Sequence, residues 1–282
     1  MIPAIKKDEA FIDEVKHFEN DAANFHLWWL GQSGYLIAWQ GKKILIDPYL
    51  SDSLTAKYAD TNKPHIRMSE LVVRPELLTG ISIVSSSHNH TDHLDAATLI
   101  PVIQNNPGIS FIIPEANRLF VAERVKITAG YPRGLDEAAS VTINDFTFHG
   151  IAAAHNELDR DEEGRYKYLG YIIRFGKWTI YHSGDTLWYE DLEEKLAGFS
   201  IDLALLPING NDPARGVAGN LNTDEAALLA KAAGIRHVIP CHYDMFTFNT
   251  ADPALFAAKA ESLGQPYTIL APGEQWAWGY GL

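Results

Sequence analysis

The segment SSSHNHTDHLD, residues 85–95, carries three histidines and two aspartates directly after the apolar run ISIV. ISIVSSS predicts a buried strand and DAATLIPVI a helix, so the histidines lie in a strand-to-helix loop. Such a loop can direct several side chains at one point. The spacing H-x-H-x-D-H brings imidazoles and a carboxylate within reach of a divalent cation such as zinc, manganese or iron. The candidate ligands are His88, His90, Asp92 and His93.

This loop constrains the fold, because it offers too few ligands to complete sites for two ions. Three further candidates follow other predicted strands: His155 after GIAAA, Asp185 after WTIYHSG and His242 after HVIPC. A single histidine at a strand end is more often structural than a ligand. All of them together favour a fold in which four strand ends meet at one edge.

The order of the predicted elements is compatible with such an edge. An amphipathic helix over residues 8–23 precedes three short strands, FHLWWL, YLIAWQ and KILIDPYL, whose turns GQSG and GK predict an antiparallel meander. Strands and helices then alternate through residues 81–125. A second series has strands SVTIN, FTFHGIAAA, YLGYIIRF and WTIYHSG, a helix LWYEDLEEKLA, a strand IDLALLPI, a helix TDEAALLAKAAG, a strand HVIPCH and a helix PALFAAKAESL.

Strands followed by helices therefore occur twice, which predicts two similar halves with a boundary near residue 140. Each half is expected to be a sheet with helices on its outer face. No low-complexity linker separates the halves, so a single domain over residues 1–282 is the expectation.

Composition limits the kinds of molecule that the protein is expected to bind and the compartment that suits it. The formal charge of −13 disfavours binding to nucleic acid or anionic lipid, so a small-molecule substrate is expected. The single cysteine, Cys241, suits a reducing compartment, and we interpret it as a buried thiol without a chemical role. The sequence has no signal peptide and no apolar run near the ~20 residues of a membrane span, which predicts a soluble, cytoplasmic protein.

Four stretches resemble the successive metal motifs of the metallo-β-lactamase superfamily: SHNHTDHLD, AAAHN, YHSGDT and IPCHYDMF. The resemblance covers roughly residues 25–245. FHLWWLGQSGYLI, YHSGDTLWY, IDLALLPINGNDPARG and HVIPCHYDMF are further similar to the L-ascorbate-6-phosphate lactonase-like branch. The segments between Asp47 and His88 and between His155 and Tyr168 look shorter than in that branch, and both are expected to border the pocket.

The resemblance implies an α/β fold, the αββα sandwich, with two β-sheets flanked by helices and one or two divalent ions at a shared edge. Position by position, His88, His90 and His155 would hold a first ion. Asp92, His93 and His242 would hold a second, and Asp185 would bridge both. Asp47 would orient a ligand or the loop, although a turn-forming Asp before Pro48 is an equally good interpretation.

Such a ligand set implies hydrolysis. A bound cation makes hydroxide available at neutral pH, so no Ser or Cys nucleophile is needed. Asp92 is expected to act both as a ligand and as the group that takes a proton from water and passes it to the leaving group.

Other residues are weaker candidates. His182 is expected to hydrogen-bond substrate or only to pack, and Arg215 to bind a phosphate or only to be solvated. Tyr243 and Asp244 are expected to line the pocket or to support the ligand His242. The remaining histidines have no partner motif and are interpreted as structural: His17, His26, His65, His149 and His237.

The first functional hypothesis is a metal-dependent lactonase, with a sugar-phosphate lactone as one form of its substrate. The alternatives are a phosphodiesterase acting on a cyclic nucleotide, phospholipid or RNA, and a non-catalytic metal-binding module. The last is disfavoured because all seven ligand positions are filled. The ligands do not separate zinc from manganese or iron. A homo-oligomer is left open.

Overall fold

The first strands alternate between two hydrophobic layers, as the two-residue period of a strand requires. Trp28 packs in a layer beneath helices, Trp29 packs between the sheets, and both are fully buried. In the computed structural model, which describes residues 1–278, these strands belong to a seven-stranded sheet of order β13-β1-β2-β3-β4-β5-β6. Its members are β1 (His26–Gly31), β2 (Gly34–Trp39), β3 (Lys42–Ile46), β4 (Ile81–Ser85), β5 (Ser110–Pro114), β6 (Arg133–Leu135) and β13 (Gln275–Ala277).

The second sheet faces the first and has six strands in the order β12-β11-β10-β9-β8-β7. A continuous hydrophobic core fills the space between the sheets, with Ile37 and Ile83 from one side and Phe148 and Ile173 from the other. The strands are β7 (Ser140–Ile143), β8 (Phe146–Ala152), β9 (Leu169–Phe175), β10 (Trp178–His182), β11 (Leu203–Pro207) and β12 (His237–Cys241).

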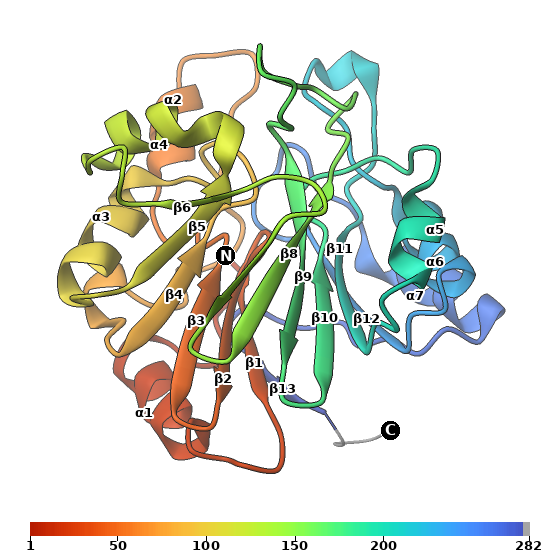
Figure 1. Cartoon of the computed structure of the whole chain (residues 1–282). Coiled ribbons are helices and arrows are strands. Elements are labelled where there is room, and N and C mark those ends of the chain that lie inside the picture. The colour runs from red at the N-terminus through yellow and green to blue at the C-terminus, as the bar shows by residue number, and fades with distance from the viewer. Residues whose placement is uncertain (279–282) are drawn as a thin grey trace.

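Helices cover the outer side of each sheet, which completes the predicted αββα sandwich (Figure 1). The apolar faces of α1, α3 and α4 pack on the first sheet, and those of α5, α6 and α7 on the second. None of the helices in residues 1–278 is both long and apolar enough to cross a membrane. Their bounds are α1 (Asp8–Phe18), α2 (Ser53–Tyr58), α3 (Ala96–Asn105), α4 (Arg118–Val125), α5 (Leu192–Ala197), α6 (Thr223–Ala232) and α7 (Pro253–Leu263), with short 3-10 helices at Pro75–Leu77, Glu115–Asn117 and Pro213–Arg215.

Two helices are shorter than the sequence predicts. α1 ends at Phe18 and not near residue 23, because the Asp21 carboxylate accepts the backbone N–H of Ala23 and folds the chain into a turn. α5 begins at Leu192 and not at residue 187, because hydrogen bonds hold the preceding segment against the C-terminal end of β8 and the residues that follow it. There the Tyr189 hydroxyl donates to the carbonyl of Ala152.

The two halves also differ from the prediction in one respect. The second sheet begins at Ser140, near the expected boundary, but β13 from the C-terminal end of the chain pairs antiparallel with β1 in the first sheet. The first sheet is therefore built from both ends of the chain. A single domain over 1–282 stays a prediction, since residues 279–282 lie outside the described part.

The strand directions bring the candidate residues to one edge. β3 and β4 are parallel, so Asp47 and the His88 loop leave the first sheet at the same end. β8 and β10 are both antiparallel to β9, and β10, β11 and β12 are parallel. His155, Asp185 and His242 therefore leave the second sheet at one end.

Candidate metal centre

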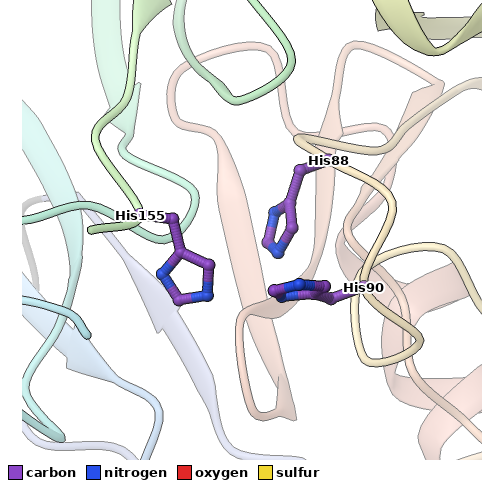
Figure 2. A group of neighbouring side chains, drawn as sticks. All are labelled: His88, His90 and His155. Atoms are coloured by element: carbon purple, nitrogen blue, oxygen red, sulfur yellow. The ribbon is translucent and has the colours of Figure 1, made fainter. Parts of the chain in front are cut away.

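One group of three imidazoles lies where the loop after β4 meets the end of β8. His88, His90 and His155 each offer a ring nitrogen, and these nitrogens lie within 4.8 Å of one another. Figure 2 shows the three rings converging from two separate segments of the chain. Nδ1 of His155 lies 2.8 Å from the carbonyl oxygen of Gly219, to which it can donate. That hydrogen bond leaves Nε2 of His155 free to accept a cation.

A second group lies beside the first and joins both sheets. It consists of Asp92, His93 and His242, whose ligand atoms also fall within 4.8 Å of one another. The Asp92 carboxylate oxygen Oδ2 is 3.7 Å from Nε2 of His93 and 3.6 Å from Nε2 of His242. The geometry of this group suits a second cation.

Asp185 lies between the two groups. One carboxylate oxygen is 3.3 Å from Nε2 of His93, and the other is 3.4 Å from Nε2 of His242 and 3.6 Å from Nε2 of His155. A carboxylate in this position can contact ions in both groups at once. All seven predicted ligands are thus brought together.

Asp47 is buried next to the second group and holds His93 and the loop after β4 in place. Its Oδ2 is 2.6 Å from Nδ1 of His93, and its Oδ1 accepts the backbone N–H of Ser87 at 2.8 Å. A carboxylate that accepts from Nδ1 fixes the tautomer in which Nε2 of His93 is available for a cation. Asp47 therefore does more than form a turn before Pro48.

Buried atoms without partners show that the residues fit a metal ion. Within residues 1–278, Nε2 of His88, Nε2 of His93 and Oδ1 of Asp185 are buried and have no hydrogen-bond partner. Buried polar atoms are normally satisfied, because an unpaired one costs on the order of 1–3 kcal/mol. A divalent cation coordinated by these two nitrogens and this oxygen would give all three atoms a partner.

The charges of the site are tightly coupled. Burial lowers the pKa of His90 to about 4 and holds that of His88 well below its usual value. Burial works against protonation of His242 too, but Asp185 and Asp92 raise its pKa to about 9. Burial alone would raise the pKa of Asp185, yet His93 and His242 hold it well below the ordinary range. Cations would take the place of the protons on the imidazoles beside the carboxylates.

The backbone is strained at the same place. Asp47, Gln32 and His242 have φ values of 42°, 52° and 66°, in the left-handed region that L-residues other than Gly rarely adopt. Strain of this kind persists where the surrounding structure enforces it, and it concentrates at functional sites.

A cavity of about 480 Å³ opens in front of the cluster. Its walls include ligands of both groups, Tyr168, and residues from the segment that contains α2. This confirms that the segment between Asp47 and His88 borders the pocket. From the segment between His155 and Tyr168, only those two end residues line the cavity.

Gln32 is a site residue that sequence reasoning missed. Its side-chain amide donates to Oδ2 of Asp92 at 2.8 Å and contacts Nε2 of His242 at 3.0 Å. The stretch GQSG looks like ordinary turn chemistry, so only the left-handed conformation of Gln32 distinguishes it. His65, interpreted as structural, also lines the cavity.

Two predicted substrate contacts are placed elsewhere. His182 is buried between the sheets, where Nε2 meets the carbonyl of Ser33 at 2.9 Å and Nδ1 accepts the N–H of Gly184. Tyr243 is buried as well, and its hydroxyl donates to the carbonyl of Leu270 at 2.6 Å. Neither lines the cavity.

Arg215 and Asp244 also lie outside the cavity lining. The Arg215 guanidinium donates to Oδ1 of Asn249 and to the carbonyls of Asn209 and Gly210, so it braces its own loop and does not face a ligand. Asp244 is half-buried, and no hydrogen bond joins its carboxylate to the cluster in residues 1–278.

The comparisons with known proteins agree with this geometry. Residues 26–242 match the family model described as the beta-lactamase superfamily domain. The chain is 31% identical over 253 residues to a UPF0173 metal-dependent hydrolase of Pyrococcus furiosus, covering 87% of this chain and 96% of that protein. It is 28% identical over 252 residues to a protein of the same description from Caldivirga maquilingensis, covering 88% and 96%.

Solved structures share the fold. An isothiocyanate hydrolase from Delia radicum gut bacteria superposes with a TM-score of 0.71 at 21% identity, covering 89% of this chain and 98% of that one. A metallo hydrolase from the archaeon Ignicoccus hospitalis gives 0.65 at 23% identity, covering 91% and 99%. At these identities the likeness concerns the fold alone.

Proposed function

The chain belongs to the beta-lactamase superfamily, among its UPF0173 metal-dependent hydrolases, and from that premise we propose that it opens a lactone ring. The observation that carries the proposal is the convergence of seven ligand-type side chains, five of which line one cavity. We assign His88, His90 and His155 to one ion and Asp92, His93 and His242 to another, with Asp185 between them.

When bound, one or two ions of zinc, manganese or iron supply Lewis acidity that activates water and polarises a carbonyl oxygen. The chain's own residues do the rest. Asp92, which belongs to the second group, accepts a proton from water and then delivers it to the leaving oxygen. Burial would raise the pKa of Asp92, but His93 and His242 hold it well below its ordinary value, so the carboxylate starts in the accepting form.

Gln32 and Asp47 position this machinery. The Gln32 amide holds one oxygen of Asp92, so the carboxylate keeps a fixed direction. Asp47 holds the ring of His93 through Nδ1. Neither residue needs to touch substrate, and their effect on turnover is exerted through Asp92 and His93.

A lactone is the favoured substrate for two reasons. The resemblance to the lactonase-like branch includes stretches that hold no metal ligand, such as FHLWWLGQSGYLI. The cavity of about 480 Å³ also suits a small molecule better than a polymer. A phosphodiesterase is the second candidate, because Lys57, Lys63 and Arg124 line the same cavity and favour an anionic substrate.

The proposal is tested by measuring proton release from a neutral sugar lactone, from a phosphorylated sugar lactone and from bis(4-nitrophenyl) phosphate. The protein is loaded in turn with zinc, manganese or iron, and bound metal is counted per chain. Opening of either lactone that fails in Asp92→Asn supports the lactonase. Hydrolysis of the diester alone would replace it with the phosphodiesterase.

A further inference from the structure

One wall of the cavity is contributed by the segment between β3 and β4. We call its lining residues the α2 wall: Leu54, Lys57, Tyr58, Lys63 and His65. None of them belongs to the metal centre, and the proposed chemistry uses none of them. The wall therefore faces whatever part of a substrate extends away from the ions.

The α2 wall carries two lysines and no carboxylate, although the chain as a whole is acidic. The whole chain has a formal charge of −13, yet Lys57 and Lys63 both line the cavity. The carboxylates in the lining are those of Asp92 and Asp185, both part of the metal centre. Once cations neutralise these two, the remaining charge of the cavity is positive, which favours an anionic ligand.

The lysine amines are available to a ligand. Among the described residues, neither Lys57 nor Lys63 forms a salt bridge with a carboxylate, and Nζ of Lys57 lies 5.1 Å from the centroid of the Tyr58 ring. Nζ of Lys63 donates to the carbonyl of Gly216 across the cavity mouth and keeps further N–H donors. Arg124 contributes charge from another wall, but its Nη1 is held by the carbonyl of Asn89 and its guanidinium lies over Phe120.

The wall is also held in place. The ring of His65 stacks on Tyr58 with centroids 4.5 Å apart and meets Phe246 edge-on at 5.2 Å. Nδ1 of His65 donates to the carbonyl of Lys63 at 2.8 Å, which fixes the ring against the loop that carries Lys63. A rigid wall loses little entropy when it binds.

We propose that the α2 wall binds an anionic group of the substrate, a carboxylate or a phosphate, at a distance from the bond that is cleaved. Lys57 and Lys63 supply the charge, and the packed rings of His65 and Tyr58 hold the segment that carries them in place. This inference rests on the proposed function, since it assigns the substrate class of the same site. The anion-binding role expected of Arg215 is thereby moved to two lysines of the segment between Asp47 and His88.

The test uses three open-chain acids that differ only at carbon 6: gluconate with a hydroxyl, glucarate with a carboxylate and 6-phosphogluconate with a phosphate. Their binding to the metal-loaded protein is measured by calorimetry, which requires no turnover. The variants are Lys57→Met, Lys63→Met and the double variant. Lys231→Met is the matched control, because Lys231 is exposed on α6 and does not line the cavity.

The expected result is that the anionic acids bind roughly tenfold more tightly than gluconate, and that the preference weakens at high salt. The double variant loses the preference, whereas Lys231→Met keeps it. Equal gains for glucarate and 6-phosphogluconate assign a general anion site, and a gain for the latter alone assigns a phosphate site. No preference in the parent protein, or one that survives in the double variant, overturns the proposal.

The outcome is separable from that of the proposed function. If no lactone is opened but the preference for an anion at carbon 6 holds, the α2 wall stands and the lactonase falls. If lactones are opened without such a preference, the lactonase stands and the wall has no role in selecting substrate. Metal content and thermal midpoint are compared across all variants, so that loss of folding is recognised.

Discussion

The carboxylate of Asp47 lies 2.6 Å from Nδ1 of His93, and both side chains are fully buried behind the metal centre. The pair links the end of β3 to the loop after β4, so the meander and the ligand loop are fixed to each other. Partners of this kind orient the imidazole and raise its basicity toward a metal.

Asp47→Asn is expected to lower metal affinity by about 10-fold to 100-fold, because an amide NH₂ would face Nδ1 of His93 and disfavour the metal-binding tautomer. The measurement is a titration with a competing chelator. The control is Asp244→Asn, since Asp244 is the other residue proposed from sequence to support a ligand, and its carboxylate makes no bond to the cluster in residues 1–278. Equal losses in the two variants would contradict the role of Asp47.

Gln32→Asn is expected to lower kcat by about tenfold while the thermal midpoint stays near that of the parent. Asn tolerates the left-handed backbone at this position, but its shorter side chain cannot reach Oδ2 of Asp92. Steady-state kinetics on the lactone that proves to be a substrate provide the measurement. Gln40→Asn is the control, because Gln40 has a similar φ of 48° and is exposed.

Gly184→Ala is expected to destabilise the fold by about 3 kcal/mol, and Gly234→Ala by about 1 kcal/mol. Both glycines have positive φ, but a Cβ at Gly184 would lie 2.8 Å from the carbonyl oxygen of Leu169 and from Cβ of Ser87, whereas nothing lies within 4 Å at Gly234. Urea unfolding measures the difference. Equal destabilisation would show that the crowding around Gly184 relaxes freely.

The lowered pKa of Asp21 predicts that the free energy of unfolding depends on pH. The hydrogen bond to His26, with help from the N–H of Ala23, lowers its pKa to about 2 from an ordinary 3.8. A depressed folded-state pKa gives stability that is present above about pH 4 and is lost as the pH falls through 2. Asp21→Asn should cost ~0.5–1 kcal/mol at pH 7, since the site is solvent-screened, and less as the pH falls below 4.

Unfolding free energies at several pH values between 2 and 7 test this prediction. Asp13→Asn serves as the comparison, because the Asp13 side chain is 78% exposed and its contact with Lys16 is 3.8 Å long. A constant difference between Asp21→Asn and the parent at every pH would rule out the titration of Asp21 as the cause.

The grouping of the seven proposed ligands was predictable because the sequence pattern that indicates it is local. The spacing from His88 to His93 is visible in one loop, and His155, Asp185 and His242 each follow a strand. Strand direction then brings them to one edge, which is a rule of sheet geometry and needs no knowledge of packing.

The cavity walls were not predictable in the same way. The resemblance predicted that the segment between Asp47 and His88 borders the pocket, but nothing in the local pattern of Lys57 and Lys63 indicates that these two side chains line it. His182 and Tyr243 were expected to contact substrate but do not line the cavity, for a different reason. They are neighbours of ligands in sequence, but their side chains project into the protein interior.

The pairing of β13 with β1 has a consequence for how this chain leaves the ribosome. His26 pairs with Ala277, so the β1 edge of the first sheet has no neighbouring strand until the chain has been made as far as Ala277. An open border of this kind invites pairing with other nascent chains. The loop after β4 is therefore made early, but its sheet cannot be completed until all six strands of the second sheet and then β13 have been made.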